Sequence, residues 1–129
     1  MQKHDIRSRR DIEVLVQAFY RKVRQHPSIG PFFNETIKDW DEHIEKLTGF
    51  WETNLLGVRA YHGNPLKIHI SVDQNFSNGL EQAHFGNWLQ LWFNTVDELY
   101  AGKNALKAKE NARKIAHIMF IRLFEARKS

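Results

Sequence analysis

Hydrophobic positions recur at spacings of three and four along most of the chain, the pattern of amphipathic helices. The first such segment runs from Asp11 to Gln25, and Asp11 can cap its start. Two prolines and a glycine within 26–31 then end the helix and turn the chain before Phe32 and Phe33. The inward-facing positions of this first helix are Ile12, Leu15, Val16, Phe19, Tyr20 and Val23.

Three further segments have helical spacing. A second helix is predicted from about Asp39 to just before Gly57, with His43 on its inward face, and a third from about 80 to 102. The last is predicted over 104–126, with lysines and arginines facing solvent. Its expected inner side chains are Leu106, Ile115, Met119, Leu123 and Phe124.

The stretch from Gly57 to Gly79 is less regular and predicts at most a short helix at 66–70. Long structureless loops are uncommon in compact domains, and a bound prosthetic group would organise this one. Neither strand-like alternation nor an internal repeat nor a low-complexity linker interrupts the chain. We therefore expect one all-α domain over residues 1–129, with residues 1–10 forming a frayed N-terminal segment.

Composition narrows the chemistry. Nine Phe, four Trp and three Tyr suit either a bulky core or a lining for a flat apolar ligand. The chain has no cysteine, which excludes disulfides, thiolate catalysis and covalently attached c-type heme. Phosphate-binding glycine loops and the sequence signatures of zinc proteases, serine hydrolases and dinucleotide-binding folds are also missing.

The net charge of +4 raises the question of nucleic acid or an acidic partner. The basic residues are spread along the chain, which favours a solvated helix face over a nucleic-acid surface. The charged N-terminus does not look like a secretory signal, and no apolar run is long enough to span a membrane. We expect a cytoplasmic protein that binds neither membrane nor nucleic acid.

Seven histidines remain as candidates for metal chemistry. A structural zinc site ordinarily pairs Cys with His, and no cysteine is present. Heme demands less, because the porphyrin supplies four nitrogens and the protein needs to add only one axial imidazole.

A set of motifs, in a fixed order along the chain, resembles the group III truncated hemoglobins, a bacterial globin family. The motifs are FY at 19–20, IGPFFN at 29–34, WDEH at 40–43, FW at 50–51, LLG at 55–57, PLKIH at 65–69 and HFGNWLQLW at 84–92. The resemblance covers nearly the whole chain and is more specific than any single histidine.

This resemblance implies a truncated globin fold, a two-over-two α-helical sandwich around non-covalently bound heme b. His69, in the Pro-Leu-x-x-His element, would be the proximal iron ligand, and Phe33 would pack on the porphyrin. Tyr20, His43 and Trp88 would lie on the distal side, where the gas binds.

The chemistry of these side chains agrees with such roles. A phenolic O–H and an indole N–H can both donate to the partial negative charge on oxygen bound to ferrous heme, which should slow its release. We expect binding of oxygen, nitric oxide and similar diatomic ligands, with nitric oxide dioxygenase or peroxidase-like redox activity supported by an external reductase. Simple oxygen delivery fits tight binding less well.

Several alternatives stay open. His84, one turn before Trp88, competes with His69 as the axial ligand, while His62 looks like a loop residue. His43 could contact the gas or act as a gate. Lys46 is the first choice for a cation that meets a heme propionate, ahead of Arg59 and Lys67. From a different class, the chain could be a heme-free helical module that binds nucleic acid or an acidic protein through its basic last helix.

Overall fold

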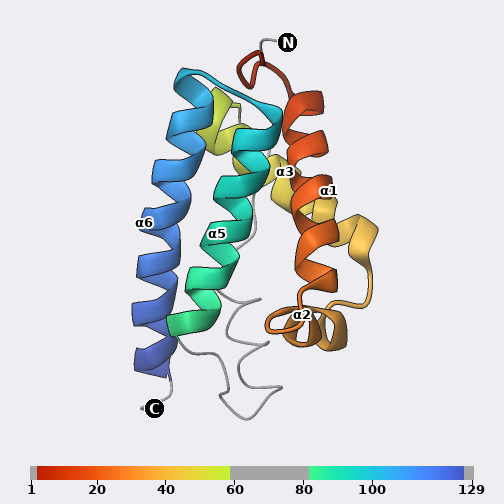
Figure 1. Cartoon of the computed structure of the whole chain (residues 1–129), viewed down its shortest axis with the longest axis vertical. Helices are drawn as coiled ribbons and strands as arrows, with labels where there is room; N and C mark the ends of the chain where they lie inside the picture. The colour runs from red at the N-terminus through yellow and green to blue at the C-terminus, as the bar shows by residue number, and fades with distance from the viewer. Residues whose placement is uncertain (1–2, 59–81, 127–129) are drawn as a thin grey trace.

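The computed structural model describes residues 3–58 and 82–126, and each element in this part of the chain is a helix. The helices are α1 (Arg9–Gln25), α2 (Gly30–Thr36), α3 (Trp40–Leu56), α5 (Gln82–Leu99) and α6 (Lys103–Ala126) (Figure 1). The prediction of an all-helical fold is therefore confirmed. The short helix expected at 66–70 lies outside the described residues.

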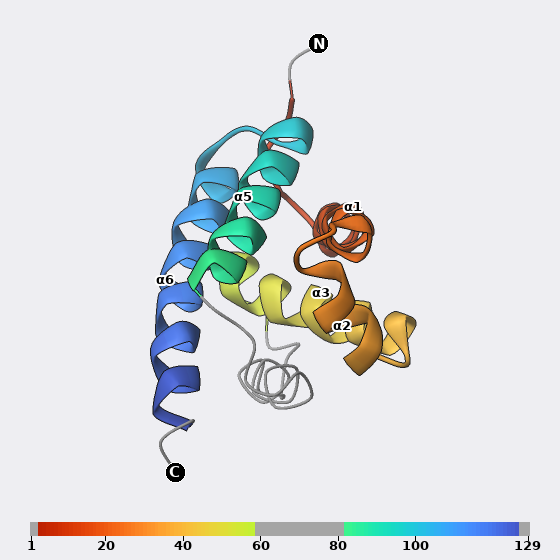
Figure 2. The ribbon, with the colours of Figure 1, turned by 60° about the horizontal axis from the view of Figure 1, so that its bottom comes forward.

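The helices pack as two pairs. Helix α1 packs against α3, α5 packs against α6, and α1 also contacts α5, which joins the pairs. Figure 1 shows α5 and α6 side by side, and Figure 2, which looks nearly along α1, shows α3 running across the bundle. This is the expected two-over-two arrangement. The six side chains predicted to face inward from α1 are all buried.

Helix α1 begins slightly earlier than its hydrophobic pattern predicts. Ser8 is its N-cap, and the Ser8 hydroxyl accepts a hydrogen bond from the backbone N–H of Asp11 at 3.2 Å. The prediction that Asp11 caps the helix is wrong. Asp11 lies in the first turn, where its negative charge interacts favourably with the positive end of the helix dipole.

Residues 3–8, within the segment 1–10 that the sequence predicts to be frayed, make specific contacts with the rest of the fold. Ile6 is fully buried. The Asp5 carboxylate accepts hydrogen bonds from the backbone N–H groups of Asn104 and Ala105, both at 2.9 Å, and so caps α6. Burial opposes ionisation of Asp5, but hydrogen bonds from these N–H groups and from that of Ile6 hold its pKa below the usual value.

The sequence analysis did not predict helix α2, because glycine and proline at 30–31 ordinarily break helices. Its first residues are Gly30 and Pro31, and a proline fits the first turn because the N–H that it lacks has no partner there. A Cβ on Gly30 would lie 2.8 Å from the carbonyl oxygen of Arg24, so glycine lets α2 pack against the end of α1. Helix α3 starts as predicted, with Asp39 accepting from the N–H of Glu42 at 3.0 Å.

The first part of the inner face of α6 consists of alanines, and Met119 farther along the helix is buried as predicted. Leu106, expected inside, is 54% exposed. The backbone of α6 can therefore approach α5 closely, and the indole N–H of Trp92 donates to the carbonyl of Ala108 at 3.1 Å. The buried alanines of α6 are Ala105, Ala108, Ala112 and Ala116.

In the described part of the chain, no helix is long and apolar enough to cross a membrane.

Candidate functional site

Tyr20 lies late in α1 at the centre of an aromatic cluster. Its side chain is 2% exposed, and its ring centroid lies 4.9 Å from that of Phe19 and 5.0 Å from that of His43. The ring centroids of Trp40 and Phe33 follow at 5.6 Å and 6.3 Å. Tyr20 thus connects three helices, because Phe33 belongs to α2 and both His43 and Trp40 belong to α3.

His43 lies in the first turns of α3 and faces inward, as the sequence predicts. It is 6% exposed, and its ring meets those of Tyr20 and Trp40 edge to face, at 5.0 and 5.6 Å. Asp39 positions this residue through the cap that starts α3 four residues earlier. A buried imidazole in this position can donate or accept a hydrogen bond toward the space beside the phenol.

Trp88, on α5, is the third residue that the sequence analysis predicts for the distal side. It is 7% exposed, its ring meets Phe19 edge to face at 5.5 Å, and it is nearly parallel to Trp92 at 6.4 Å. Trp92 in turn stacks on Trp51 at 4.7 Å. The predicted trio Tyr20, His43 and Trp88 therefore comes together in one buried cluster, although the three residues belong to three different helices.

Burial dominates the electrostatics of this cluster. It raises the pKa of Tyr20 well above the ordinary value of a phenol, because the phenolate would lose its hydration. The neighbouring indole of Trp88 acts in the opposite direction, lowering the pKa, and is the weaker influence. Tyr20 consequently keeps its proton at neutral pH and can serve as an O–H donor.

Of the other predicted site residues, Phe33 is buried and Lys46 lies at the surface. Phe33 is 3% exposed and joins the aromatic cluster from α2. Lys46 lies at the surface, with its side chain 56% exposed and its ammonium 2.9 Å from the Glu42 carboxylate one turn earlier. Among the described residues, its recorded partner is Glu42 and not a member of the buried trio.

Of the two competing histidines, only His84 lies within the described residues. Its ring meets that of Phe32 at 4.8 Å, at the beginning of α5. His69 and His62 lie outside the described residues, as do Arg59 and Lys67. The proximal ligand is therefore still an expectation from the resemblance.

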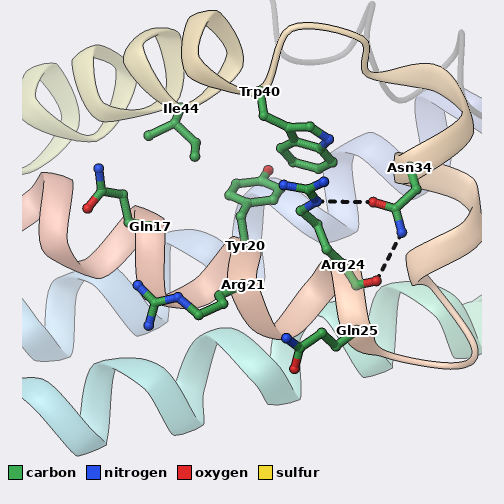
Figure 3. A pocket seen from close by; sticks show the side chains of 8 residues that line it. All are labelled: Gln17, Tyr20, Arg21, Arg24, Gln25, Asn34, Trp40 and Ile44. Carbon is green, nitrogen blue, oxygen red and sulfur yellow. Dashed lines mark hydrogen bonds between the residues drawn. The ribbon is translucent and has the colours of Figure 1, made fainter.

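Two residues near the site are absent from the sequence prediction. Trp40 touches both Tyr20 and His43, and the guanidinium carbon of Arg24 lies 4.5 Å from the centre of its ring. A signal for both exists in the sequence, since Trp40 precedes His43 by three residues and Arg24 follows Tyr20 by four. Beside these side chains is a cavity of about 560 Å³ between α1, α2 and the start of α3 (Figure 3).

No family model matches the chain, but a curated protein and a solved structure both place it beside the same family. The group 3 truncated hemoglobin ctb of Campylobacter jejuni is 33% identical over 102 residues, which cover 76% of each chain. A crystal structure of a group III truncated hemoglobin from Campylobacter jejuni superimposes with a TM-score of 0.81 and 31% identity, over 95% of each chain.

Proposed function

Because the chain belongs to the group III truncated hemoglobins, a family of heme globins that bind diatomic ligands, we propose that its Tyr20 and Trp88 hold the bound gas. The observation that carries the proposal is the buried pairing of a phenolic O–H with an indole N–H, in the cluster that His43 completes. The same observation fits heme, whose distal side needs donors within an apolar, water-poor enclosure.

We assign the remaining contacts to heme from the family pattern. His69 is the proposed proximal ligand of the iron, and Phe33, already buried beside Tyr20, is the proposed packing partner of the porphyrin. Lys46 at the surface, which pairs with Glu42, is the proposed partner of a propionate. It would either leave Glu42 or bind both carboxylates. We propose heme b as the group, held without a covalent link, since a chain without cysteine cannot attach heme as c-type proteins do.

The bound heme supplies the iron at which a diatomic gas binds and polarises oxygen toward negative charge. Tyr20 keeps its proton and would donate to that charge, and the indole of Trp88, which can only donate, would do the same. His43 covers the same pocket from α3 and, together with Trp40, limits the access of water. If both groups donate to the bound gas in this apolar cluster, its release would be slow.

Slow release favours chemistry of the bound gas over its delivery to another site. The reaction that we propose is nitric oxide dioxygenation, in which oxygen, nitric oxide and one electron give nitrate, and an external reductase supplies the electron. Peroxidase-like chemistry is the second candidate, since the same polar donors can polarise an O–O bond. Membership of the truncated hemoglobin family favours a heme globin over a heme-free interaction module, and the choice between the two reactions is our proposal.

Oxygen dissociation from the ferrous protein tests the two-donor proposal. Each of Tyr20→Phe and Trp88→Phe should quicken release by about 10- to 100-fold, since a hydrogen bond to a charged partner contributes roughly 1.5–3 kcal/mol. Phe93→Leu on α5 is a control, because Phe93 packs under Arg113 rather than against Tyr20, and its rate should match the parent. Unchanged rates in both donor variants would overturn the proposal.

A further inference from the structure

The cavity outside the aromatic cluster has a chemistry of its own. Its volume of about 560 Å³ lies within the range of pockets that bind small organic molecules. We name it the α1–α3 groove. Its lining residues are Gln17, Tyr20, Arg21, Arg24, Gln25, Asn34, Trp40 and Ile44.

The groove is positively charged. Two of its lining residues are arginines one turn apart on α1, and none of the eight is acidic. Elsewhere in the described chain, arginines of α1 are matched by carboxylates: Arg9 pairs with Glu45 and Glu52, and Arg10 pairs with Glu13. Arg21 forms no ion pair with any described residue, and Arg24 has hydrogen bonds only with an amide there. The excess charge of the groove therefore has no counter-charge among the described residues.

Arg24 is pre-oriented. Its Nε donates to the side-chain oxygen of Asn34 at 3.2 Å, and Asn34 donates back to the Arg24 carbonyl at 2.9 Å. The guanidinium also lies 4.5 Å from the centre of the Trp40 ring. These contacts fix the plane of the guanidinium while its two terminal nitrogens stay available, the geometry that suits a carboxylate or phosphate.

The opposite wall is aromatic and apolar. Figure 3 shows Trp40 and Ile44 extending from α3 over the polar side chains of α1, with Tyr20 between the two helices. A flat ring can pack against this wall while its anionic group meets the arginines. A small inorganic oxyanion would leave most of the groove unfilled.

We propose that the α1–α3 groove is a binding site for a planar aromatic anion. The anionic group binds Arg24 and Arg21, and the ring lies against Trp40, Tyr20 and Ile44. Such a ligand would be one side chain away from His43, because Tyr20 contacts both. The groove is built from α1, α2 and α3 alone, so the proposal does not depend on the proposed heme chemistry.

Isothermal titration calorimetry of the heme-loaded protein tests this site with matched probes. We expect 2-naphthoate to bind at least about tenfold more tightly than its neutral analogue 2-naphthamide, because a charge-assisted hydrogen bond contributes that much. Binding should weaken as salt concentration rises. Equal affinity for the two probes, or heat only with sodium nitrate, would overturn the proposal.

Substitutions locate the binding. Arg24→Gln should weaken 2-naphthoate about tenfold, and Arg21→Gln should weaken it several-fold. The second variant removes a charge without removing a hydrogen bond or ion pair to any described residue, so its effect on binding is separated from the loss of such contacts. Arg113→Gln is the control, since Arg113 also lies over an aromatic ring, that of Phe93 at 5.3 Å, but on α6. Unchanged affinity in both groove variants, or an equal loss in Arg113→Gln, would contradict the site.

Discussion

Tyr20 belongs to both of the sites that we propose. One edge of its ring contacts His43 within the buried cluster, and the side chain also lines the α1–α3 groove. Its position follows from a simple helical pattern, since Val16, Phe19 and Val23 on the same face of α1 are also buried. The pattern alone could not predict that Trp88, from a helix more than 60 residues later, lies in the same cluster.

The raised pKa of Tyr20 leads to a prediction about pH. A free phenol ionises near pH 10.0, whereas buried Tyr20 keeps its proton above that value. The oxygen dissociation rate should therefore stay flat between about pH 8 and pH 10, above the range in which imidazoles titrate. Stopped-flow measurement across this range checks it. A marked acceleration as pH approaches 10 would mean that the phenol ionises at its ordinary pKa.

The same shift has a consequence for stability. The unfolded chain ionises its tyrosine near pH 10.0, and the folded chain does so only at higher pH. The contribution of Tyr20 is thus fully present below pH 10.0 and is lost as pH rises toward the folded pKa. Compared with the parent, Tyr20→Phe should lose less stability on going from neutral pH to pH above 10, in urea unfolding measured at both values.

At the scale of elements, the junction between α5 and α6 depends on the N-terminal residues. Gly102 has φ +139°, and a Cβ there would lie 2.6 Å from Cγ of Asp5. The Asp5 carboxylate occupies that space because it caps α6 across the chain. The sequence shows a breaker between two helices, but not which distant residue uses the space beside it.

Gly102→Ala should therefore destabilise the fold, by roughly 1–3 kcal/mol, from a strained φ and displacement of the Asp5 cap. Gly86→Ala is the matched control. Gly86 lies within α5, and a Cβ there would meet nothing within 4 Å, so alanine should raise stability by up to about 1 kcal/mol. Thermal unfolding of both variants measures the contrast. A Gly102→Ala protein as stable as the parent would contradict the account of this junction.

Periodicity predicted the long helices because each buries one face in the core. It missed α2 because Gly30 and Pro31 break helices in most contexts but start one here. It also misjudged Leu106, since the close approach of α5 selects alanines for the inner face of α6. The distal trio was identified from the order of family motifs, and the groove needed the positions of α1 and α3 relative to each other.

At the scale of the whole molecule, two helix pairs place aromatic side chains from α1, α2, α3 and α5 in one cluster. In the function that we propose, this cluster is the distal half of a heme site, with α1 providing Tyr20 and α5 providing Trp88. The proximal half depends on His69, which lies outside the described residues. The central claim is therefore that heme is bound through one histidine opposite this cluster.

The ferrous absorption spectrum of heme-loaded His69→Gly, compared with heme-loaded His84→Gly, tests this claim most directly. We predict that the parent and His84→Gly keep the spectrum of a histidine-ligated heme, and that His69→Gly loses its axial ligand or its heme. Added imidazole should restore the ligand in His69→Gly by filling the space that the side chain vacates. Loss of the axial ligand in His84→Gly alone, or a parent protein that takes up no hemin, would contradict the account.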